Sequence, residues 1–291
     1  MTRPVGDLNE LRTRSPLAVA EAAAARRRRA LVGVDGRLLV VAADHPARGA
    51  LGVRDDPWAM ASRTGLLGRL RTALARPGVD GVLATPDVLE DLLLLGDLDD
   101  KVVFGSMNRG GLQGARFELD DRFTAYDAAA IAAAGFDGGK MLTRIDLDDP
   151  ATARTLEASA RAVSALASRQ LVAMVEPFMS SRVDGRVVND LSAEGVISSI
   201  HIAQALGATS AYTWLKLPVV PDMARVMDAT TLPTLLLGGD PFGHADDTFA
   251  EWGKALTLPS VRGLVVGRAL LFPRDGDVAA AVDAAAALVH G

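Results

Sequence analysis

The chain has 291 residues, of which 49% are hydrophobic and 23% charged, and its formal net charge is −5. These proportions are typical of a folded globular protein and exclude a disordered or collagen-like chain. The absence of cysteine excludes disulfide scaffolds, thiolate catalysis and zinc–thiolate or iron–sulfur sites. The acidic balance gives no general attraction to nucleic acid, and no apolar run approaches the roughly 20 residues that cross a bilayer. We therefore expect a cytoplasmic protein that binds neither nucleic acid nor membranes.

The first thirty residues predict a helical extension that precedes the main domain. They lack the uninterrupted apolar stretch of a signal peptide. The pattern favours an alanine-rich helix with Ser15 as N-cap, Pro16 at its first position and Arg26–Arg29 in its last turns. We interpret the four arginines as a solvated cationic helix end, with a patch for an anionic partner as the alternative. The expected domains are residues 1–30 for the extension and 31–291 for the catalytic domain.

From residue 38 onward, eight short apolar runs alternate with longer helical segments. Short β-branched runs bounded by Gly, Pro or Asp are typical of buried strands in a parallel sheet. The predicted strands are 38–43, 79–84, 102–105, 138–142, 171–175, 212–217, 234–237 and 263–266. The predicted helices between and after them include 59–76, 88–95, 150–167, 192–206, 244–256 and 277–290.

Eight strand–helix units without a linker predict an α/β fold, a single (β/α)₈ TIM barrel with an extra N-terminal helix. A doubly wound open sheet is the alternative, and it is disfavoured because no glycine fingerprint follows the first strand. In a TIM barrel the functional side chains lie at the carboxyl ends of the strands and in the loops after them. The residues at those predicted ends are Asp44, His45, Arg48, Ser106, Asn108, Arg109, Lys140, Arg144, Glu176, Lys216, Gly238, Gly239, Asp240, Gly267 and Arg268.

Lys216 is the most informative of these residues. It lies in the run YTWLKLP, flanked by large apolar side chains at a position expected to be buried. Burial of an ammonium group is costly, so the surroundings either pair it with a carboxylate or lower its pKa. A neutral lysine in a polar pocket is what Schiff-base chemistry with a carbonyl requires. A lysine at the strand edge with its amine in solvent is the alternative.

Two more charged residues are expected beside Lys216. Lys140 interrupts another predicted strand, in DGGKML, and a second cation would depress the pKa of a nucleophilic amine. Glu176 lies between the two lysines in strand order and could pair with either or transfer protons. A purely structural ion pair between Lys140 and Glu176 is the alternative. Both interpretations place the three charges in one cluster.

Asp44 and His45 follow the first predicted strand. The pair resembles part of a metal or general-base site, but the chain offers few further ligands to complete a divalent-metal centre. We therefore expect neither a metal nor a cofactor and assign Asp44 to binding substrate hydroxyls. For His45, a packed or hydrogen-bonded role and a catalytic role stay open. Arg48 and Asn108 are further substrate-binding candidates.

Glycines mark the ends of the last two predicted strands, in LLLGGDP and LVVGRALLF. TIM barrels frequently build a phosphate site at this place from backbone N–H groups. Gly238, Gly239 and Gly267 would let the backbone approach an anion, and Arg268 would add a charged contact. Plain turn glycines are the alternative.

These motifs together carry a family resemblance. The sequence AADH at residues 42–45, the lysines at 140 and 216, EP at 176–177, LGGDP at 237–241 and VVGRALLFP at 265–273 resemble the class I barrel aldolases. The resemblance covers residues 38–275 and is greatest to the tagatose-bisphosphate and sulfofructosephosphate aldolases. Archaeal-type fructose-bisphosphate aldolase is more distant. One departure is His45, where the tagatose enzymes have an amide, which bears on the distal end of the substrate.

The resemblance implies that Lys216 forms the Schiff base, that Lys140 and Glu176 belong to the proton-transfer cluster and that Asp44 holds substrate hydroxyls. It also implies a phosphate grip by Gly239, Gly267 and Arg268. The expected activity is reversible cleavage of a phosphorylated keto-sugar or deoxy-keto-sugar acid by a homo-oligomeric enzyme, with dihydroxyacetone phosphate as one product.

Three alternatives to this activity are open. A deoxyribose-phosphate aldolase would also need a lysine on the seventh predicted strand, and TLPTLLLGG has none. A sugar-phosphate isomerase or epimerase would use Asp44 and Glu176 on the same barrel. A non-catalytic regulator would bind a sugar phosphate without turnover.

Overall fold

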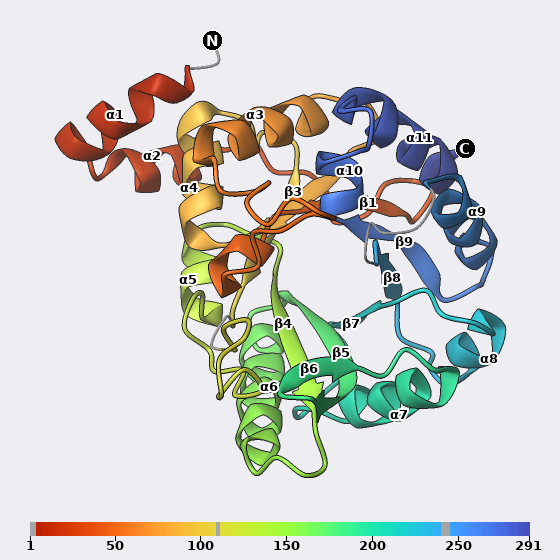
Figure 1. Cartoon of the computed structure of the whole chain (residues 1–291). Helices are drawn as coiled ribbons and strands as arrows, with labels where there is room; N and C mark the ends of the chain where they lie inside the picture. The colour runs from red at the N-terminus through yellow and green to blue at the C-terminus, as the bar shows by residue number, and fades with distance from the viewer. Residues whose placement is uncertain (1–3, 109–110, 240–244) are drawn as a thin grey trace.

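In the computed structural model of the chain, eight parallel strands close into a barrel surrounded by helices (Figure 1). The structure describes residues 4–108, 111–239 and 245–291. The barrel strands are β1 (Leu38–Ala42), β2 (Gly81–Ala84), β3 (Val102–Ser106), β4 (Gly138–Ile145), β5 (Val172–Val183), β7 (Thr213–Leu217), β8 (Thr234–Leu237) and β9 (Val261–Val266). Their order is β4-β3-β2-β1-β9-β8-β7-β5, and the pairing of β4 with β5 closes the barrel. The predicted TIM barrel is therefore confirmed.

Helices follow the strands in the predicted alternation. They are α3 (Arg63–Leu74), α4 (Pro86–Leu95), α5 (Ala128–Ala133), α6 (Ala151–Ala167), α7 (Ala193–Gln204), α8 (Met223–Asp228), α9 (Ala245–Leu256), α10 (Arg268–Leu271) and α11 (Val278–His290). Several of these helices begin where the sequence provides an N-cap. Ser62, Ser192 and Asp127 each accept a hydrogen bond from a backbone N–H in the first turn. Within the described ranges, no helix is long and apolar enough to cross a membrane.

Alternation along the strands separates two apolar layers. In β1, Leu38, Val40 and Ala42 point into the barrel interior, while Leu39 and Val41 point outward against the helices. The interior layer is completed by side chains from other strands, among them Phe104, Val172, Met174, Leu235 and Val265. Side chains thus fill the barrel interior, as is usual for a barrel of eight strands.

The N-terminal extension contains α1 (Leu8–Arg14) and α2 (Ala18–Ala25), which lie outside the barrel wall at the upper left of Figure 1. The predicted extra helix is present, but its expected ends are wrong. Ser15 ends α1 instead of capping α2, and α2 stops at Ala25 because Arg26 turns to an extended backbone, with φ −60° and ψ 129°. The arginine run is therefore not a helix end.

Arg26 and Arg29 tie the extension to the barrel, which corrects the solvated interpretation for these two residues, whereas the side chains of Arg27 and Arg28 are 66% and 55% exposed. The Arg26 guanidinium is buried and donates to the carbonyl oxygens of Lys101 (2.7 Å) and Gly135 (2.6 Å). The next three arginines pair with acidic residues that precede strands. These pairs are Arg27 with Asp99 and Asp100, Arg28 with Asp137 and Arg29 with Asp80. Acidic groups brought together by the barrel, which no local pattern reveals, hold the arginines in place.

Replacing Arg26 by alanine should lower the free energy of unfolding by about 2–3 kcal/mol, because two carbonyl groups lose a charged donor in a buried place. Arg27→Ala is the matched control. Its side chain is 66% exposed, and its loss should change stability little. Urea denaturation of the three proteins checks this expectation, and equal midpoints for Arg26→Ala and the unaltered protein would contradict it.

Candidate active site

Four charged side chains form one cluster at the carboxyl ends of the strands. Their side chains meet because every second residue of a barrel strand points inward. Asp44 continues the inward series Val40 and Ala42 of β1. Glu176 continues the inward series Val172 and Met174 of β5. Lys140 on β4 is in register with Met174, and Lys216 on β7 lies two residues beyond Trp214. We call Asp44, Lys140, Glu176 and Lys216 the charge cluster.

Opposite charges alternate through the charge cluster at hydrogen-bonding distance. The Nζ atom of Lys140 lies 2.9 Å from Asp44 Oδ2 and 2.5 Å from Glu176 Oε2. The Nζ atom of Lys216 lies 2.7 Å from Glu176 Oε1. All four side chains are buried. Glu176 therefore bridges the two lysines, and the sequence-based expectation of a single three-charge group is confirmed.

The two lysines differ in their surroundings, and this separates their roles. Burial lowers the pKa of Lys216, and the nearby charge of Lys140 lowers it further, against the opposing effect of Glu176. Burial also opposes the charge on Lys140, but the carboxylates of Asp44 and Glu176 outweigh it and raise the pKa of Lys140 above its usual value. Of the two amines, Lys216 is therefore the one that loses its proton more readily.

The two carboxyl groups are held in their ionised form. Burial opposes the charge on Glu176, yet Lys140 and Lys216 lower its pKa to about 2. Burial likewise acts against Asp44, and the positive charge of Lys140, with that of Lys216, holds its pKa well below the usual range. At neutral pH both carboxylates are therefore acceptors, and Glu176 can receive a proton from the Lys216 nitrogen that it touches.

His45 opens the short 3₁₀ turn η2 (His45–Arg48) directly after Asp44. Its Nδ1 atom lies 3.6 Å from Asp44 Oδ1, beyond hydrogen-bonding distance, and is buried without a hydrogen-bond partner among the described residues. Burial lowers the pKa of His45 to about 3, and the charges of Arg268 and Arg48 contribute in the same direction while Asp44 opposes them. His45 is thus neutral at the rim of the charge cluster, and its role stays a prediction.

The glycine-marked strand ends lie next to each other because β8 and β9 are paired. Gly239 has a φ of +66°, which favours glycine. A Cβ atom at Gly267 would approach the Ala42 carbonyl oxygen to 2.6 Å, and one at Gly238 would approach Val266 Cγ1 to the same distance. Arg268 follows Gly267 at the start of α10. The structure therefore brings the predicted phosphate-binding residues to one corner of the barrel mouth.

Asn108 lies at the end of β3 with its amide bonded to the backbone. Its Nδ2 atom donates to the carbonyl oxygens of Leu142 (2.5 Å) and Asp121 (3.2 Å), and its Oδ1 atom accepts from Leu142 N–H (2.8 Å). These contacts give Asn108 a structural part in joining β3, β4 and the loop before α5. Its role in substrate binding stays a prediction. Arg109 and Asp240, the other strand-end candidates nearby, lie outside the described residues.

Arg144 is a residue whose role sequence reasoning missed. It extends from β4 and binds Asp121 through two nitrogens, at 2.9 and 2.8 Å, and Glu118 at 3.3 Å. Arg144 and Asp121 are buried, so this contact anchors the long loop after β3 above the barrel. The signal that could have found it is an arginine two residues beyond the predicted strand 138–142, in the mostly apolar run MLTRI that continues the strand.

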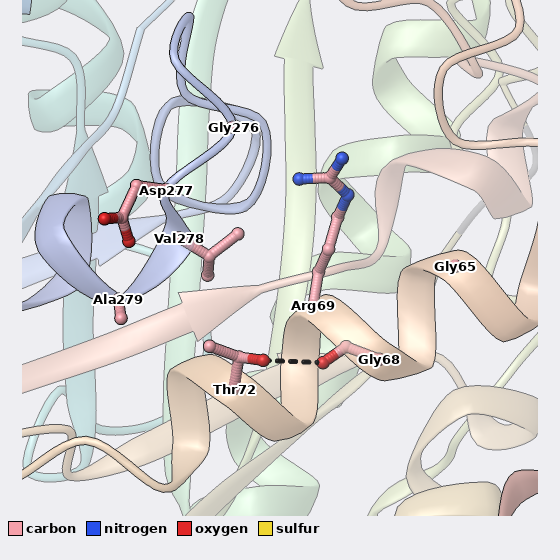
Figure 2. Close-up of a pocket in the computed structure, with 8 residues that line it drawn as sticks. All are labelled: Gly65, Gly68, Arg69, Thr72, Gly276, Asp277, Val278 and Ala279. Carbon is pink, nitrogen blue, oxygen red and sulfur yellow. Dashed lines mark hydrogen bonds between the residues drawn. The ribbon is translucent and has the colours of Figure 1, made fainter.

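A separate hollow of about 430 Å³ lies on the outer surface between α3 and α11 (Figure 2). Figure 2 shows Arg69 and Thr72 on α3 facing the start of α11, and Thr72 Oγ1 donates to the Gly68 carbonyl oxygen. Arg69 itself donates to the Leu271 carbonyl oxygen at 2.9 Å and lies over the Phe272 ring. None of the charge cluster lines this hollow.

Comparison with known proteins places the chain in a family. A family model described as Cgl0159-like matches residues 36–286. The chain belongs to this family. It is 60% identical to Cgl0159 from Corynebacterium glutamicum, whose crystal structure it matches with a TM-score of 0.96 over 98% of this chain and 96% of that chain. No curated protein matches the chain.

More distant matches share the barrel. An archaeal fructose-1,6-bisphosphate aldolase, solved with its catalytic lysine bound to the carbinolamine intermediate of the substrate, is 18% identical. The TM-score of this match is 0.66, over 94% of the present chain and 100% of the aldolase chain. Fructose-bisphosphate aldolase from Slackia heliotrinireducens is 15% identical, with a TM-score of 0.58 over 99% and 93% of the two chains. At these identities the likeness shows the fold.

Proposed function

We propose that this member of the Cgl0159-like family is a class I aldolase that forms a Schiff base on Lys216. Its substrate is a phosphorylated keto-sugar or deoxy-keto-sugar acid, which it cleaves reversibly. The observation that carries the proposal is the buried Lys216 amine with a lowered pKa, 2.7 Å from Glu176. The fold shared with aldolases that use a catalytic lysine supports it. The tagatose-bisphosphate and sulfofructosephosphate aldolases are the narrower group that we favour.

The first half of the reaction follows from the charge cluster. The neutral Lys216 amine attacks the substrate carbonyl carbon, and the new nitrogen–carbon bond places a positive charge on nitrogen. Glu176 receives a proton from that nitrogen and passes it to the oxygen of the former carbonyl. The hydroxyl group then takes one further proton from the solvent and leaves as water, while the nitrogen lone pair forms the carbon–nitrogen double bond of the iminium.

The second half uses the iminium as an electron sink. A base removes the proton from the hydroxyl group two carbons from the iminium carbon, and the carbon–carbon bond breaks as its electrons move into the enamine. The aldehyde leaves first. Protonation of the enamine carbon and attack of water on the iminium then release the ketone, which we propose is dihydroxyacetone phosphate, and return the amine.

Lys140 and Asp44 hold this arrangement in place. Because Lys140 is charged and hydrogen-bonded to both carboxylates, it orients Glu176 toward Lys216, and its charge lowers the pKa of the Lys216 amine. Asp44 accepts hydrogen bonds, and we propose that substrate hydroxyl groups take up its remaining acceptor capacity.

None of these steps requires a metal ion, so EDTA should leave the activity unchanged. Loss of activity with EDTA and its return with a divalent metal would favour a metal-dependent isomerase or epimerase instead.

The corner at Gly239, Gly267 and Arg268 is our proposed phosphate grip. Backbone N–H groups at the two strand ends would donate to the phosphate oxygens, and Arg268 would add a charged hydrogen bond. The position of this corner beside β1 and the charge cluster supports a substrate whose phosphate lies near the reacting carbonyl.

Replacing Arg268 by alanine should reduce kcat/KM by about 10- to 100-fold, the scale of one charged hydrogen bond. The effect should appear mainly as a raised KM, because a phosphate contact is made equally in the ground state and the transition state. Arg262→Ala is the control, since Arg262 is exposed near the opposite end of the same strand, β9. Steady-state kinetics with a ketose phosphate checks this, and an unchanged KM in Arg268→Ala would remove the phosphate assignment.

A further inference from the structure

The strand β5 continues beyond the barrel rim as one arm of a hairpin. Its last residues pair antiparallel with β6 (Arg186–Asn189), in the register Ser180 with Asn189 and Val183 with Arg186. Asp184 and Gly185 form the turn, and both have a positive φ, at 49° and 78°. Two such residues are typical of the tight turn that matches strand twist. Figure 1 shows this hairpin at the rim of the barrel, beside β4 and α7.

The outer edge of β6 is open. Among the described strands, β6 pairs with β5 alone and ends the order of the sheet. In an antiparallel pair the backbone groups of successive residues point alternately toward the partner strand and away from it. Asp190 N–H donates to the Met179 carbonyl oxygen across the hairpin, so Val187 and Asn189 turn their N–H and C=O groups to the open edge.

The side chains beside this edge are partly apolar and largely exposed. Val183 and Val188 are 52% and 46% exposed and lie on one face of the hairpin, and Leu191, just after it, is 52% exposed. Arg186 and Asp190 are exposed on the same face as Val188. An edge strand with unpaired backbone groups and exposed valines beside it can pair with a strand of another chain.

The charges of this segment favour pairing with a second copy of the same strand. The sequence Arg186-Val187-Val188-Asn189-Asp190 complements itself when it is reversed about Val188. In an antiparallel pairing with a second copy centred there, Arg186 would face Asp190 of the partner subunit, and Asp190 would face Arg186 of the partner subunit. These residues would occupy the closely spaced pairs without mutual backbone hydrogen bonds, where cross-strand side chains interact most.

The same register also gives hydrogen-bond partners to the outward-facing backbone N–H and C=O groups of β6. The backbone of Val187 would exchange two hydrogen bonds with that of Asn189 of the partner subunit. By symmetry, Asn189 would exchange two more with Val187 of the partner subunit. Asp190 already accepts a hydrogen bond from Ser192 N–H at 2.9 Å through Oδ1. A carboxylate can accept several hydrogen bonds, so the ion pair does not require that contact to break.

We propose that β6 is the dimer interface of this protein. Two copies join their β6 strands antiparallel about a two-fold axis at Val188, and the two hairpins become one four-stranded sheet. Such an interface is isologous, which is the commonest arrangement in homo-oligomers. Its backbone contact is short, so the dimer should dissociate on dilution.

The first test is sedimentation velocity of the full chain over a range of concentrations. The unaltered protein should shift from monomer to dimer as its concentration rises. Arg186→Asp places like charges opposite each other twice, and Asp190→Arg does the same with the opposite sign, so each variant alone should stay monomeric. An equimolar mixture should recover the dimer, because each contact then joins one arginine to one aspartate. A protein that is monomeric throughout, or a dimer that either variant leaves intact, overturns the proposal.

A second test does not depend on charge. Because the chain has no cysteine, Val188→Cys introduces a single thiol on the proposed two-fold axis. Paired strands would hold the two Cα atoms within the distance that a disulfide spans, so mild oxidation should give a covalent dimer. Leu147→Cys is the control, since Leu147 is 81% exposed on another loop. Cross-linking of Val188→Cys no faster than that of Leu147→Cys overturns the proposal, and circular dichroism of each variant confirms that it is folded.

Discussion

Replacing Lys216 by alanine should lower kcat by about a million-fold, the scale on which enzymes lose activity when a covalent nucleophile is removed. The fold should persist, because Glu176 keeps its ion pair with Lys140 at 2.5 Å when the Lys216 amine is gone. Stopped assays with a ketose phosphate, run beside circular dichroism, measure both quantities.

Lys254→Ala is the matched control for this variant. Lys254 is an exposed lysine near the end of α9, and its loss should leave kcat unchanged. Residual activity of Lys216→Ala within tenfold of the unaltered protein would contradict the Schiff-base assignment. Lys140→Ala would then be the next variant to measure, because Lys140 is the second buried lysine of the charge cluster.

Replacing Glu176 by glutamine should lower kcat by about 10²- to 10⁴-fold, the usual contribution of a proton-transfer group. Gln is nearly isosteric with Glu and can hydrogen-bond to the lysines, so the loss reports the missing proton acceptor. The substrate KM should change much less. A loss of less than tenfold in kcat would reassign Glu176 to a structural ion pair with Lys140.

The pH dependence of the same variant tests the charge cluster. Activity requires a neutral Lys216, so kcat/KM should rise with pH through the pKa of this amine, which burial places below the ordinary 10.5. The carboxylate of Glu176 raises that pKa. Its removal should therefore move the rising limb to lower pH, and a limb displaced to higher pH would contradict the assignment.

The barrel and three members of the charge cluster could be predicted because both depend on short-range periodicity, whereas the contact of Asp44 with Lys140 was not expected. Every second residue of a barrel strand points inward, so a charged residue in an otherwise apolar strand points into the barrel interior or mouth. Lys140, Glu176 and Lys216 satisfy this condition. The different roles of the two lysines were expected, but the raised pKa of Lys140 could not be predicted, because it depends on Lys140 lying between two carboxylates while Lys216 contacts one.

Contacts between distant segments account for what the sequence analysis missed. Arg26 leaves its helix because carbonyl groups more than seventy residues away accept its hydrogen bonds. Asn108 and Arg144 are bound by groups that meet only in the closed barrel. The β6 hairpin is different, since Asp184-Gly185 between valine-rich segments is a local hairpin signal that lies beyond the predicted strand 171–175.

Reduction of the enzyme–substrate mixture with borohydride tests the central proposal most directly. The chain has four lysines, Lys101, Lys140, Lys216 and Lys254, so peptide mass spectrometry distinguishes every possible lysine adduct. With dihydroxyacetone phosphate and borohydride, we expect a stable secondary amine on Lys216, loss of activity, and no adduct when borohydride is added without the ketone. An adduct on Lys140 in place of Lys216, or no adduct with any ketose phosphate that the enzyme turns over, would contradict the account.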